Sequence, residues 1–299
     1  MGINYLDATI MWEARRRGAS FDATLTVAHL SLELHAAEVR ALREKYRASL
    51  PDAKTTPLDE YRAGDYSDAF IRGFLGARTL SILDYSAYEG ATIVHDLNQP
   101  IAAEHHGRFD AVIDGGTLEH IFNFPVAIAS LMNALKVGGH LFLKSPANNL
   151  CGHGFYQFSP ELMFRIFGEN NGFELRRIVF METMLPVETR PYRAAYEVTD
   201  PKVAGERVTL TSTRPVMMLV EARKVADVVP FANRPLQGDY VEAWQRGTGR
   251  APGGTAGDTA VRAMFARLPS WLQSRLRTLR QIRRDSLSNR RFYRRLPRS

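Results

Sequence analysis

The sequence predicts an α/β fold built around a mostly parallel sheet, and three observations support this. Short apolar runs alternate along the chain with segments of helical periodicity, which is the order expected where helices connect parallel strands. Those runs lack polar alternation, as strands do when helices cover both faces of a sheet. The 299 residues, 45% of them hydrophobic and 24% charged, suffice for one or two domains of ordinary globular composition.

The elements are expected in the following order. In the first half of the chain we expect a strand at 22–28, a helix near 32–46, a loop over 49–64, a helix at 66–75, and strands at 80–83, 91–94 and 111–113. In the second half we expect a helix at 126–135, a turn at 136–139 into a strand at 140–143, a helix at 159–167, and strands at 173–180 and 216–221. Ser159 is expected to cap the helix that Pro160 begins. The polar segment 181–212, with scattered prolines, is interpreted as an insertion or lid.

Composition divides the chain into a body, a linker and a tail. Residues 1–245 form the predicted α/β domain, with its core over 20–225, and residues 261–299 form the tail. Residues 246–260 hold five glycines, one proline and no large apolar side chain, which is typical of a flexible linker. From Arg262 to the end, twelve arginines stand against one aspartate, a net charge of +11, which leaves −4 for the rest of a chain whose total is +7.

The sequence also excludes several classes of protein. No uninterrupted apolar run reaches the roughly 18 residues of a membrane-spanning helix. The N-terminal segment carries charges where a signal peptide needs an apolar core, and Gly2 lacks the downstream Ser or Thr of a myristoylation signal. Cys151 is the single cysteine, which excludes intramolecular disulfides and thiol zinc clusters. A cytoplasmic location is therefore expected.

Four of the five predicted strand ends carry an aspartate or an asparagine pair. The residues at all five ends are Ala28-His29, which is the exception, Asp84 with Ser86, Asp96, Asp114-Gly115-Gly116 and Asn148-Asn149. Ligands of open parallel sheets bind outside the carboxyl ends of the strands. Any one of these residues taken alone is more often structural, but their joint presence on one predicted edge favours a pocket. We expect a ligand that offers hydroxyls, an amine and an adenine-like ring.

One segment carries a family resemblance. FDAVIDGGTLEHIFNFPVAIASLMNALKVGGHLFLKSP, residues 109–146, resembles the fourth and fifth strands of class I S-adenosylmethionine-dependent methyltransferases. Upstream, LSILDYSAYEGATIVHDLN resembles the second and third strands of that family, and downstream GHGFYQFSPELMFRIFGENNGFEL resembles the segment that leads into the sixth. The resemblance covers residues 20–225 and implies a Rossmann-like, doubly wound sheet that binds S-adenosylmethionine.

The resemblance also implies roles for individual residues. Asp84 stands where the family usually binds the ribose hydroxyls, and Asp96 stands where the family places a polar residue beside the adenine. The implied cofactor-binding residues are Ala28, His29, Asp84, Ser86, Asp96, Asp114, Gly115 and Gly116. Family members carry a Gly-rich loop after the first strand, whereas this chain has no glycine between Asp22 and Leu50. Either Ala28-His29 still permits close approach of a cofactor, or cofactor binding is weakened or lost.

The implied reaction is methyl transfer, and we expect O-methylation of a small-molecule or glycan-like acceptor. His120 and His153 are the candidate bases because imidazole titrates near neutral pH, although each taken alone is more often structural. No metal site is predicted, since Glu119 more commonly forms a salt bridge at a helix start and His105-His106 lacks further ligands. The alternative is a non-catalytic member of the fold that binds or scaffolds. A nicotinamide-dependent dehydrogenase ranks last because Gly-x-Gly-x-x-Gly is absent.

The loop after residue 143 offers further polar side chains. Asn148, Asn149, Tyr156 and Gln157 are candidates to bind a hydroxyl-rich acceptor. The equally weighted alternative is that these side chains satisfy one another through Asx turns. A cysteine hydrolase is not favoured, because Cys151 and His153 are only two residues apart in a Gly-rich loop.

The tail has the pattern of a basic amphipathic helix. Its apolar positions, interspersed with arginines, are Trp271, Leu272, Leu276, Leu279 and Ile282. An anionic membrane surface and the acidic body of the protein each explain both the stripe and the arginines, whereas a nucleic acid explains the arginines alone. On the membrane interpretation, a chain that ends near Gly247 keeps its fold and loses binding to anionic liposomes. Destabilisation by that truncation would instead identify the tail as a packed structural element.

Overall fold

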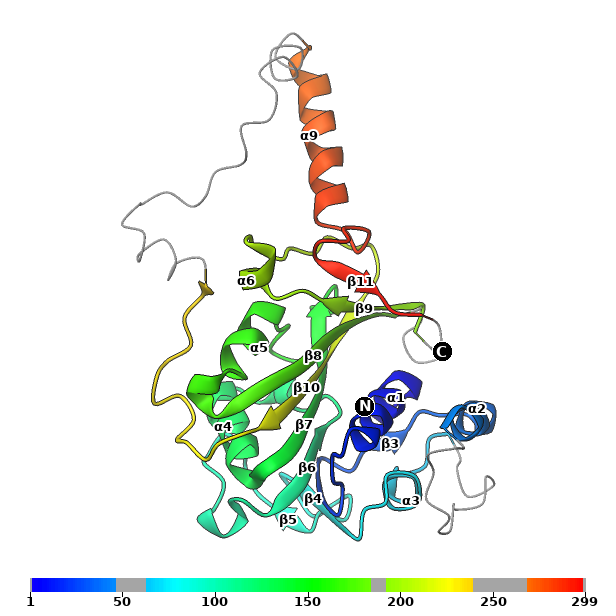
Figure 1. Cartoon of the computed structure of the whole chain (residues 1–299), viewed down its shortest axis with the longest axis vertical. Coiled ribbons are helices and arrows are strands. Elements are labelled where there is room, and N and C mark those ends of the chain that lie inside the picture. Colours follow the sequence, from blue (N-terminus) through cyan, green and yellow to red (C-terminus); the bar gives the residue numbers. More distant parts are fainter. Residues whose placement is uncertain (1, 47–62, 184–191, 239–267, 298–299) are drawn as a thin grey trace.

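The computed structural model describes residues 2–46, 63–183, 192–238 and 268–297. Its strands form one large mixed sheet and one small two-stranded sheet (Figure 1). The strands are β1 (Gly2–Ile3), β2 (Ala23–Val27), β3 (Ser31–Leu32), β4 (Thr79–Asp84), β5 (Ile93–Val94), β6 (Phe109–Asp114), β7 (Leu135–Asn148), β8 (Phe173–Glu182), β9 (Ala194–Val198), β10 (Val216–Lys224) and β11 (Tyr293–Arg295). The α-helices are α1 (Tyr5–Arg16), α2 (Ala36–Tyr46), α3 (Asp68–Gly73), α4 (Phe124–Ala134), α5 (Pro160–Ile166), α6 (Pro201–Ala204) and α9 (Ser270–Arg284). Three short 3-10 helices are η3 (Ala103–His105), η4 (Leu118–His120) and η5 (Glu169–Asn171).

The large sheet has the order β11-β9-β8-β10-β7-β6-β2-β4-β5. The five strands from β5 to β7 are parallel, and the four strands from β10 to β11 continue the sheet in antiparallel pairing. The expected parallel core is therefore confirmed, with a larger antiparallel extension than the sequence indicated. From β2 the chain runs outward to β4 and β5 and then returns to place β6 on the other side of β2. The boundary between β2 and β6 is thus a topological switch point.

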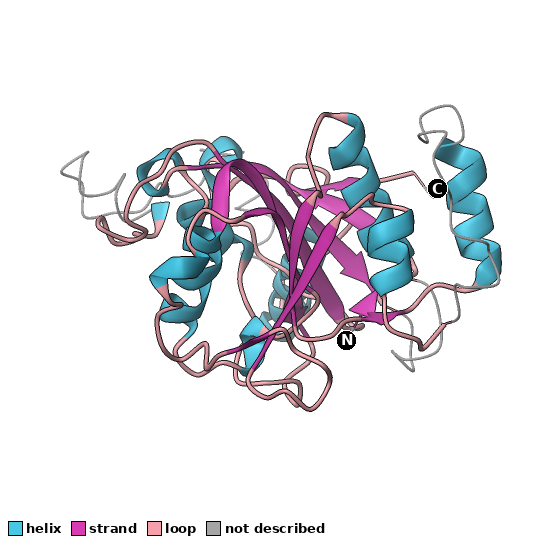
Figure 2. Cartoon of the chain, turned by 90° about the horizontal axis from the view of Figure 1, so that it is seen from below, coloured by secondary structure: helices cyan, strands magenta, loops and turns pink. Residues whose placement is uncertain are grey.

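Helices cover both faces of the sheet (Figures 1 and 2). The face that packs against α1, α2 and α3 shares a core containing Trp12 and Phe70. The opposite face packs against α4 and α5 through residues such as Leu131. Successive β6 residues point to opposite faces. Val112 lies in the core with Leu131, and Ile113 lies in the core with Trp12. Because both faces are covered, the strands read as continuous apolar runs in the sequence.

Side-chain caps fix two helix starts. Ser159 caps α5 as predicted, with its hydroxyl accepting a hydrogen bond from Leu162 N at 3.3 Å. The side chain of Asn4 caps α1 in a capping box with Asp7. No element was expected over residues 2–16. Seven of the twelve residues of α1 are buried, so its sequence shows no single apolar stripe.

Three of the expected boundaries are wrong. The helix expected from residue 32 begins at Ala36, because residues 31–32 pair with the N-terminal strand as β3. The turn expected at 136–139 belongs to β7, whose pairing with β6 shifts register there while Gly138 has φ +92°. The insertion expected at 181–212 holds the end of β8, β9 and α6, and β9 extends the sheet. The predicted linker at 246–260 and most of the loop at 49–64 lie outside the described residues.

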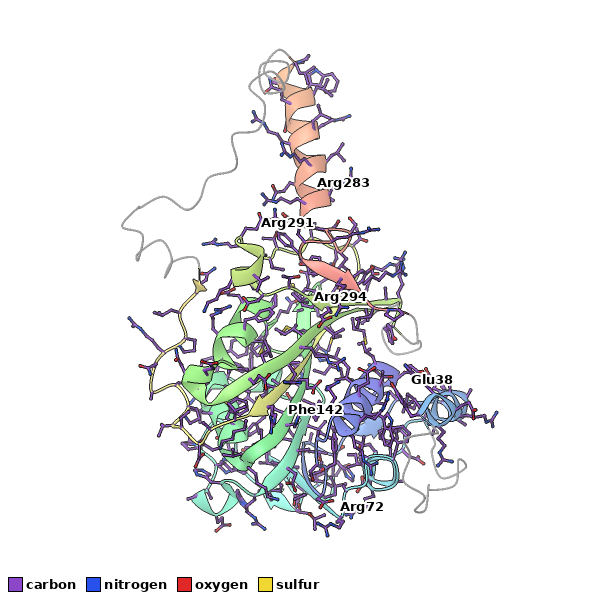
Figure 3. All side chains as sticks on the ribbon, viewed as in Figure 1. Glu38, Arg72, Phe142, Arg283, Arg291 and Arg294 are labelled. Atoms are coloured by element: carbon purple, nitrogen blue, oxygen red, sulfur yellow. The ribbon has the colours of Figure 1, made fainter. Side chains whose placement is uncertain are left out.

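The C-terminal segment is partly packed into the body. β11 pairs antiparallel with β9. Phe292 and Tyr293, at 0% and 1% exposure, lie in the core that also contains Leu131, called the main core below. α9 extends away from the body, and none of its residues is buried (Figure 1). Figure 3 shows Arg283 on this projecting helix and Arg294 beside the sheet, where Arg294 pairs with Glu197. Within the described ranges, no helix is both long and apolar enough to cross a bilayer.

Candidate functional site

The central parallel strands end at one edge of the sheet. The register places Val27 beside Leu83 of β4 and beside Asp114 of β6. Asp114 in turn lies beside Leu143 of β7. The residues that follow these strands therefore gather around the switch point, as the sequence predicts.

The loop after β2 makes its sharp turn without a glycine. Ala28 has φ +64°, a left-handed conformation that glycine adopts more readily. The ring of His29 stacks on Tyr66 with centroids 3.4 Å apart. Its two nitrogens lie 2.7 Å from Asp68 Oδ2 and 2.6 Å from the backbone oxygen of Glu89. His29 therefore ties this loop to α3 and to the loop after β4.

Leu30 and Gly115 close the space between the loops that follow β2 and β6. Leu30 is buried, and a Cβ added to Gly115 would lie 2.7 Å from Leu30 Cδ2. Gly116 has φ +118° and makes the next turn. These glycines thus serve packing within the chain, and any ligand that enters here shares the space with Leu30.

Asp114 caps the turn after β6. Its oxygens accept hydrogen bonds from the backbone N–H groups of Gly116 at 3.1 Å, Thr117 at 2.7 Å and Leu118 at 3.3 Å. Burial nevertheless raises the pKa of Asp114 above its ordinary value. Both oxygens face the protein backbone, so Asp114 shapes the loop, and its role toward a cofactor stays a prediction.

Asp84 and Asp96 occupy the β4 and β5 side of the switch point. Asp84 is half-buried and accepts one long hydrogen bond, 3.4 Å from Ser86 N, while Ser86 itself is exposed. Asp96 Oδ1 accepts from both the backbone and the side-chain nitrogen of Asn98, at 2.9 and 2.8 Å. These donors lower the pKa of Asp96 below its ordinary value. Asp84 in particular keeps capacity to accept hydrogen bonds from a ligand.

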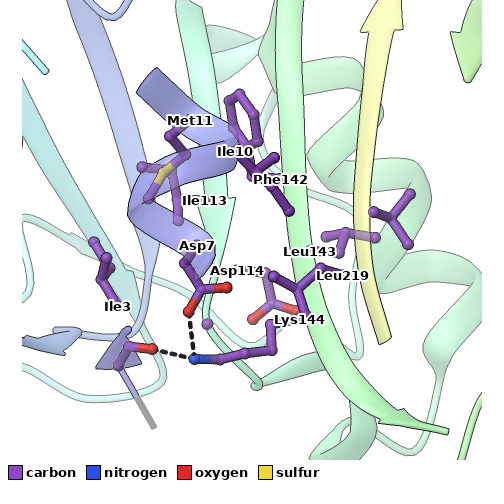
Figure 4. Close-up of a pocket in the computed structure, with 13 residues that line it drawn as sticks. Ile3, Asp7, Ile10, Met11, Ile113, Asp114, Phe142, Leu143, Lys144 and Leu219 are labelled. Carbon is purple, nitrogen blue, oxygen red and sulfur yellow. Dashed lines mark hydrogen bonds and ion pairs between the residues drawn. The ribbon is translucent and has the colours of Figure 1, made fainter. Parts of the chain in front are cut away.

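A small pocket lies beneath α1 on the β6 and β7 side (Figure 4). Ile10, Met11 and Phe142 give it apolar walls. Its polar end holds Lys144, whose Nζ donates to Asp7 Oδ2 at 2.8 Å and to the backbone oxygen of Gly2. Burial alone would lower the pKa of Lys144, but the nearby carboxylates outweigh burial and hold that pKa above its ordinary value.

Glu119 is buried at the start of the loop that leads into α4. Its exposure is 0%, and neither carboxylate oxygen has a hydrogen-bond partner among the described residues. Burial first, and then the charge of Asp114, raise the pKa of Glu119 to about 8. Its backbone oxygen accepts from Phe155 N at 2.8 Å. Gly154, at φ +81°, permits this contact, because a Cβ there would lie 2.8 Å from the same oxygen. The loop after β7 therefore closes directly over Glu119.

The two candidate bases lie beside that carboxylate. His153 Nε2 is 3.5 Å from Glu119 Oε1, and the rings of His120 and His153 meet edge to face with centroids 5.1 Å apart. The potential ligand atoms of these three residues all lie within 4.8 Å of one another. Burial and then the charge of His153 lower the pKa of His120 below its ordinary value, which makes its ring a weaker base than a free imidazole.

The four predicted acceptor-binding side chains bond to their own chain. Asn148 Nδ2 donates to Ser212 Oγ at 3.2 Å, and Asn149 Nδ2 donates to the backbone oxygen of the same serine at 2.7 Å. Tyr156 Oη donates to the backbone oxygen of residue 122 at 2.7 Å, and Gln157 Oε1 accepts from the backbone of residue 150 at 2.9 Å. These bonds favour the structural alternative for the loop, and acceptor binding by the four residues stays a prediction.

Sequence reasoning missed Asp7 and Lys144 as parts of the site. Lys144 follows a predicted strand, but nothing in the sequence links it to a carboxylate 137 residues away. The capping pattern Asn4-x-x-Asp7 was the available signal for a helix over the pocket.

These features define an open, doubly wound α/β protein whose switch point lies between β2 and β6, the place where folds of this kind bind ligands. No family model matches the chain, and no curated protein matches its sequence. Among solved structures, it is similar to the N-methyltransferase NodS from Bradyrhizobium japonicum with S-adenosylhomocysteine, at 11% identity and TM-score 0.38, over 73% of this chain and 86% of that one.

Two further solved structures are similar to this chain at a comparable level. One is the 1,6-didemethyltoxoflavin-N1-methyltransferase from Burkholderia thailandensis, at 12% identity and TM-score 0.34, over 73% of this chain and 76% of that one. The other is the branched-chain polyamine synthase from Thermus thermophilus with 5'-methylthioadenosine, at 12% identity and TM-score 0.36, over 77% of this chain and 60% of that one. Methyltransferases are thus among the structures that this chain resembles at low identity, and similarity of this kind does not select a reaction.

Proposed function

We propose that this chain binds S-adenosylmethionine and transfers its methyl group to an oxygen of a small-molecule or glycan-like acceptor. The proposal rests on two sets of polar side chains that lie on opposite sides of the switch point. Asp84 and Asp96 present carboxylates on the side of β4 and β5, and the pair His120 and His153 lies on the side of β6 and β7. The proposal assigns the nucleoside end of the cofactor to this edge, because the side chain of Asp84 accepts only one long hydrogen bond from the described residues.

The chain's own residues have distinct roles in this proposal. S-adenosylmethionine supplies a methyl group already activated on a sulfonium, so the protein mainly orients the reactants and removes a proton. Asp84 accepts hydrogen bonds from the ribose hydroxyls, and Asp96 lies beside the base. The acceptor binds beside the loops after β6 and β7, where His120 or His153 takes its hydroxyl proton.

Calorimetric titration with S-adenosylmethionine and with S-adenosylhomocysteine tests the proposal. We expect binding tighter than millimolar, and we expect Asp84→Ala to weaken it about 10- to 100-fold through loss of charged hydrogen bonds. Asp22→Ala is the matched control, because Asp22 is a partly exposed carboxylate just before β2, at the opposite end of that strand. An affinity unchanged by Asp84→Ala would remove Asp84 from the site.

One observation favours a second candidate, a non-catalytic binding or scaffolding protein of the same fold. Leu30 packs against Gly115 in the space between the loops after β2 and β6, and His29 is held by Tyr66 and Asp68. A side chain that fills this space leaves less room for the methionine part of the cofactor. Binding weaker than millimolar to both nucleosides would support this candidate.

We also propose that α9 binds an anionic membrane surface. Trp271 and Leu279 are 61% and 62% exposed, and Ile282 is 46% exposed. The arginines between them are exposed as well, and each basic residue near anionic lipid adds about 1 kcal/mol. The helix therefore offers both features that interfacial binding requires.

A further inference from the structure

The strongest unassigned feature is the carboxylate of Glu119 with the two histidines beside it. A buried carboxylate without hydrogen-bond partners is expensive, because its desolvation is not offset by any donor. Both oxygens of Glu119 are in this position among the described residues, and Nε2 of His153 is likewise buried without a partner. Glu119 Oε1 and His153 Nε2 face each other at 3.5 Å without a hydrogen bond, and this arrangement requires an explanation.

We propose that Glu119, His120 and His153 bind a divalent first-row transition-metal ion. Two imidazole nitrogens and one carboxylate oxygen form a donor set that Zn²⁺, Co²⁺ and Fe²⁺ accept in proteins. The same donors suit Mg²⁺ poorly, since Mg²⁺ prefers oxygen ligands. A dication at this position would stabilise the ionised form of the buried Glu119 carboxyl group and would use the unpartnered atoms of Glu119 and His153.

The geometry is close to that of a metal site. Donors about 2.1 Å from a tetrahedral ion lie about 3.4 Å from one another. The Glu119 Oε1 to His153 Nε2 distance is 3.5 Å, and all three donors lie within 4.8 Å of one another. His120 is exposed and His153 is partly exposed, so rotation of these two rings can close the remaining separation. Three protein ligands leave at least one position open for an oxygen ligand such as water or an acceptor hydroxyl. With the ion bound, the two histidines act as ligands in place of the role of base assigned to them under the proposed function.

Backbone contacts hold the residues of this cluster in position. Gly154 lets the loop after β7 close onto the backbone oxygen of Glu119, and Phe155 N donates to that oxygen at 2.8 Å. A turn in which His153 N donates to the backbone oxygen of Leu150 at 2.9 Å then holds the histidine beside the carboxylate. Residues from two loops, after β6 and after β7, are therefore positioned by contacts independent of any ligand.

Titration of the full chain with Zn²⁺, Co²⁺, Mn²⁺ and Mg²⁺ tests the proposal, with calorimetry and the change in melting temperature as readouts. We expect one transition-metal ion per chain, bound at least tenfold more weakly by Glu119→Gln and by His153→Ala. His105→Ala is the matched control, because His105 lies 3.6 Å from Glu104 as a histidine–carboxylate pair outside the cluster. We expect this control to bind as the unaltered chain does.

Glu119→Gln keeps the shape of the side chain and removes an ionisable group from a fully buried position, so we expect this variant to fold at least as stably without metal. Its melting temperature should no longer rise when Zn²⁺ is added. The proposal is overturned if the unaltered chain binds no transition metal, if Mg²⁺ binds more tightly than Zn²⁺, or if Glu119→Gln binds Zn²⁺ as tightly as the unaltered chain. None of these measurements contains S-adenosylmethionine, so they stand apart from the test of the proposed function.

Discussion

At the scale of single residues, Gly154 has the most constrained position in the candidate site. Its φ of +81° and the 2.8 Å that would separate an added Cβ from Glu119 O both oppose a side chain. We expect Gly154→Ala to destabilise the protein by about 1–3 kcal/mol, since the left-handed backbone and the displaced loop both contribute. Urea unfolding measures this change.

Gly152→Ala provides the matched control in the same loop. A Cβ at Gly152 meets no atom within 4 Å, and its φ lies outside the left-handed region. We expect that variant to retain the stability of the unaltered chain. Equal stability of both variants would show that the loop does not depend on its contact with Glu119.

Sequence reasoning reached the two histidines but not the reason for their proximity. The pattern after the predicted strands singled out His120 and His153 one at a time. Their meeting depends on the turn at Gly154, which is a tertiary contact that no local pattern encodes. Ala28 shows the reverse case, because the missing glycine was visible in the sequence while the φ of +64° that alanine adopts was not.

At the scale of elements, Glu221 on β10 joins α1 to the sheet. Arg17, at the end of α1, reaches its two oxygens at 2.7 and 2.8 Å, and Arg177 Nε on β8 lies 3.0 Å away. Glu221 is fully buried, so Glu221→Gln should lower the free energy of unfolding by about 3 kcal/mol. This value is at the low end for a broken buried ion pair, because Arg17 is partly exposed. Glu174→Gln is the control, since Glu174 pairs with Arg176 at the surface and should change stability by less than about 1 kcal/mol.

The pKa of Glu221 determines how the stability of the protein should change with pH. Burial would raise the pKa of Glu221, but His140, Arg17 and Arg177 outweigh burial and lower that pKa below its ordinary value. A carboxyl with a lowered folded-state pKa contributes stability above its unfolded pKa and loses it as pH falls through the folded pKa. Stability of the unaltered chain should therefore fall below about pH 4.5, and Glu221→Gln should lose less over the same range. A parallel fall in both would contradict this role.

The helix α9 carries a separate prediction. Leu276→Glu with Leu279→Glu places two charges on the exposed apolar stripe, where neither side chain supports the core. We expect this variant to stay folded and to lose sedimentation with anionic vesicles at low salt, because the apolar stripe no longer enters the interface. Thr278→Glu adds a negative charge beside the stripe and should retain most binding. Equal loss in both variants, or no binding by the unaltered chain, would contradict a membrane role for the stripe.

At the scale of the whole molecule, the sequence predicted the parallel core well and the periphery poorly. The runs at 80–83, 111–113 and 140–143 became β4, β6 and β7, because strands covered on both faces must be apolar throughout. β9 and β11 were not predicted from the sequence, since each is short and lies at or near the open edge of the sheet. Pairing between residues near 197 and 294 is a long-range contact that neither segment reveals alone.

This pairing reverses the expected effect of removing the tail. A chain that ends at Gly247 loses β11 together with Phe292 and Tyr293, which are 0% and 1% exposed in the main core. Truncating one buried aromatic side chain costs about 3–5 kcal/mol, so Phe292→Ala alone should lower the free energy of unfolding by that amount. The truncated chain should lose at least as much, because the edge of β9 also becomes unpaired.

Denaturant unfolding of three chains tests the reversal. The unaltered chain sets the reference, the chain ending at Gly247 lacks both α9 and β11, and the Leu276→Glu, Leu279→Glu variant alters only the exposed stripe of α9 while keeping β11. We expect the truncated chain to be markedly less stable and the stripe variant to match the reference, since none of the residues of α9 is buried. If the truncated chain matches the reference, the strand β11 contributes nothing to the fold, and the tail acts only through the helix.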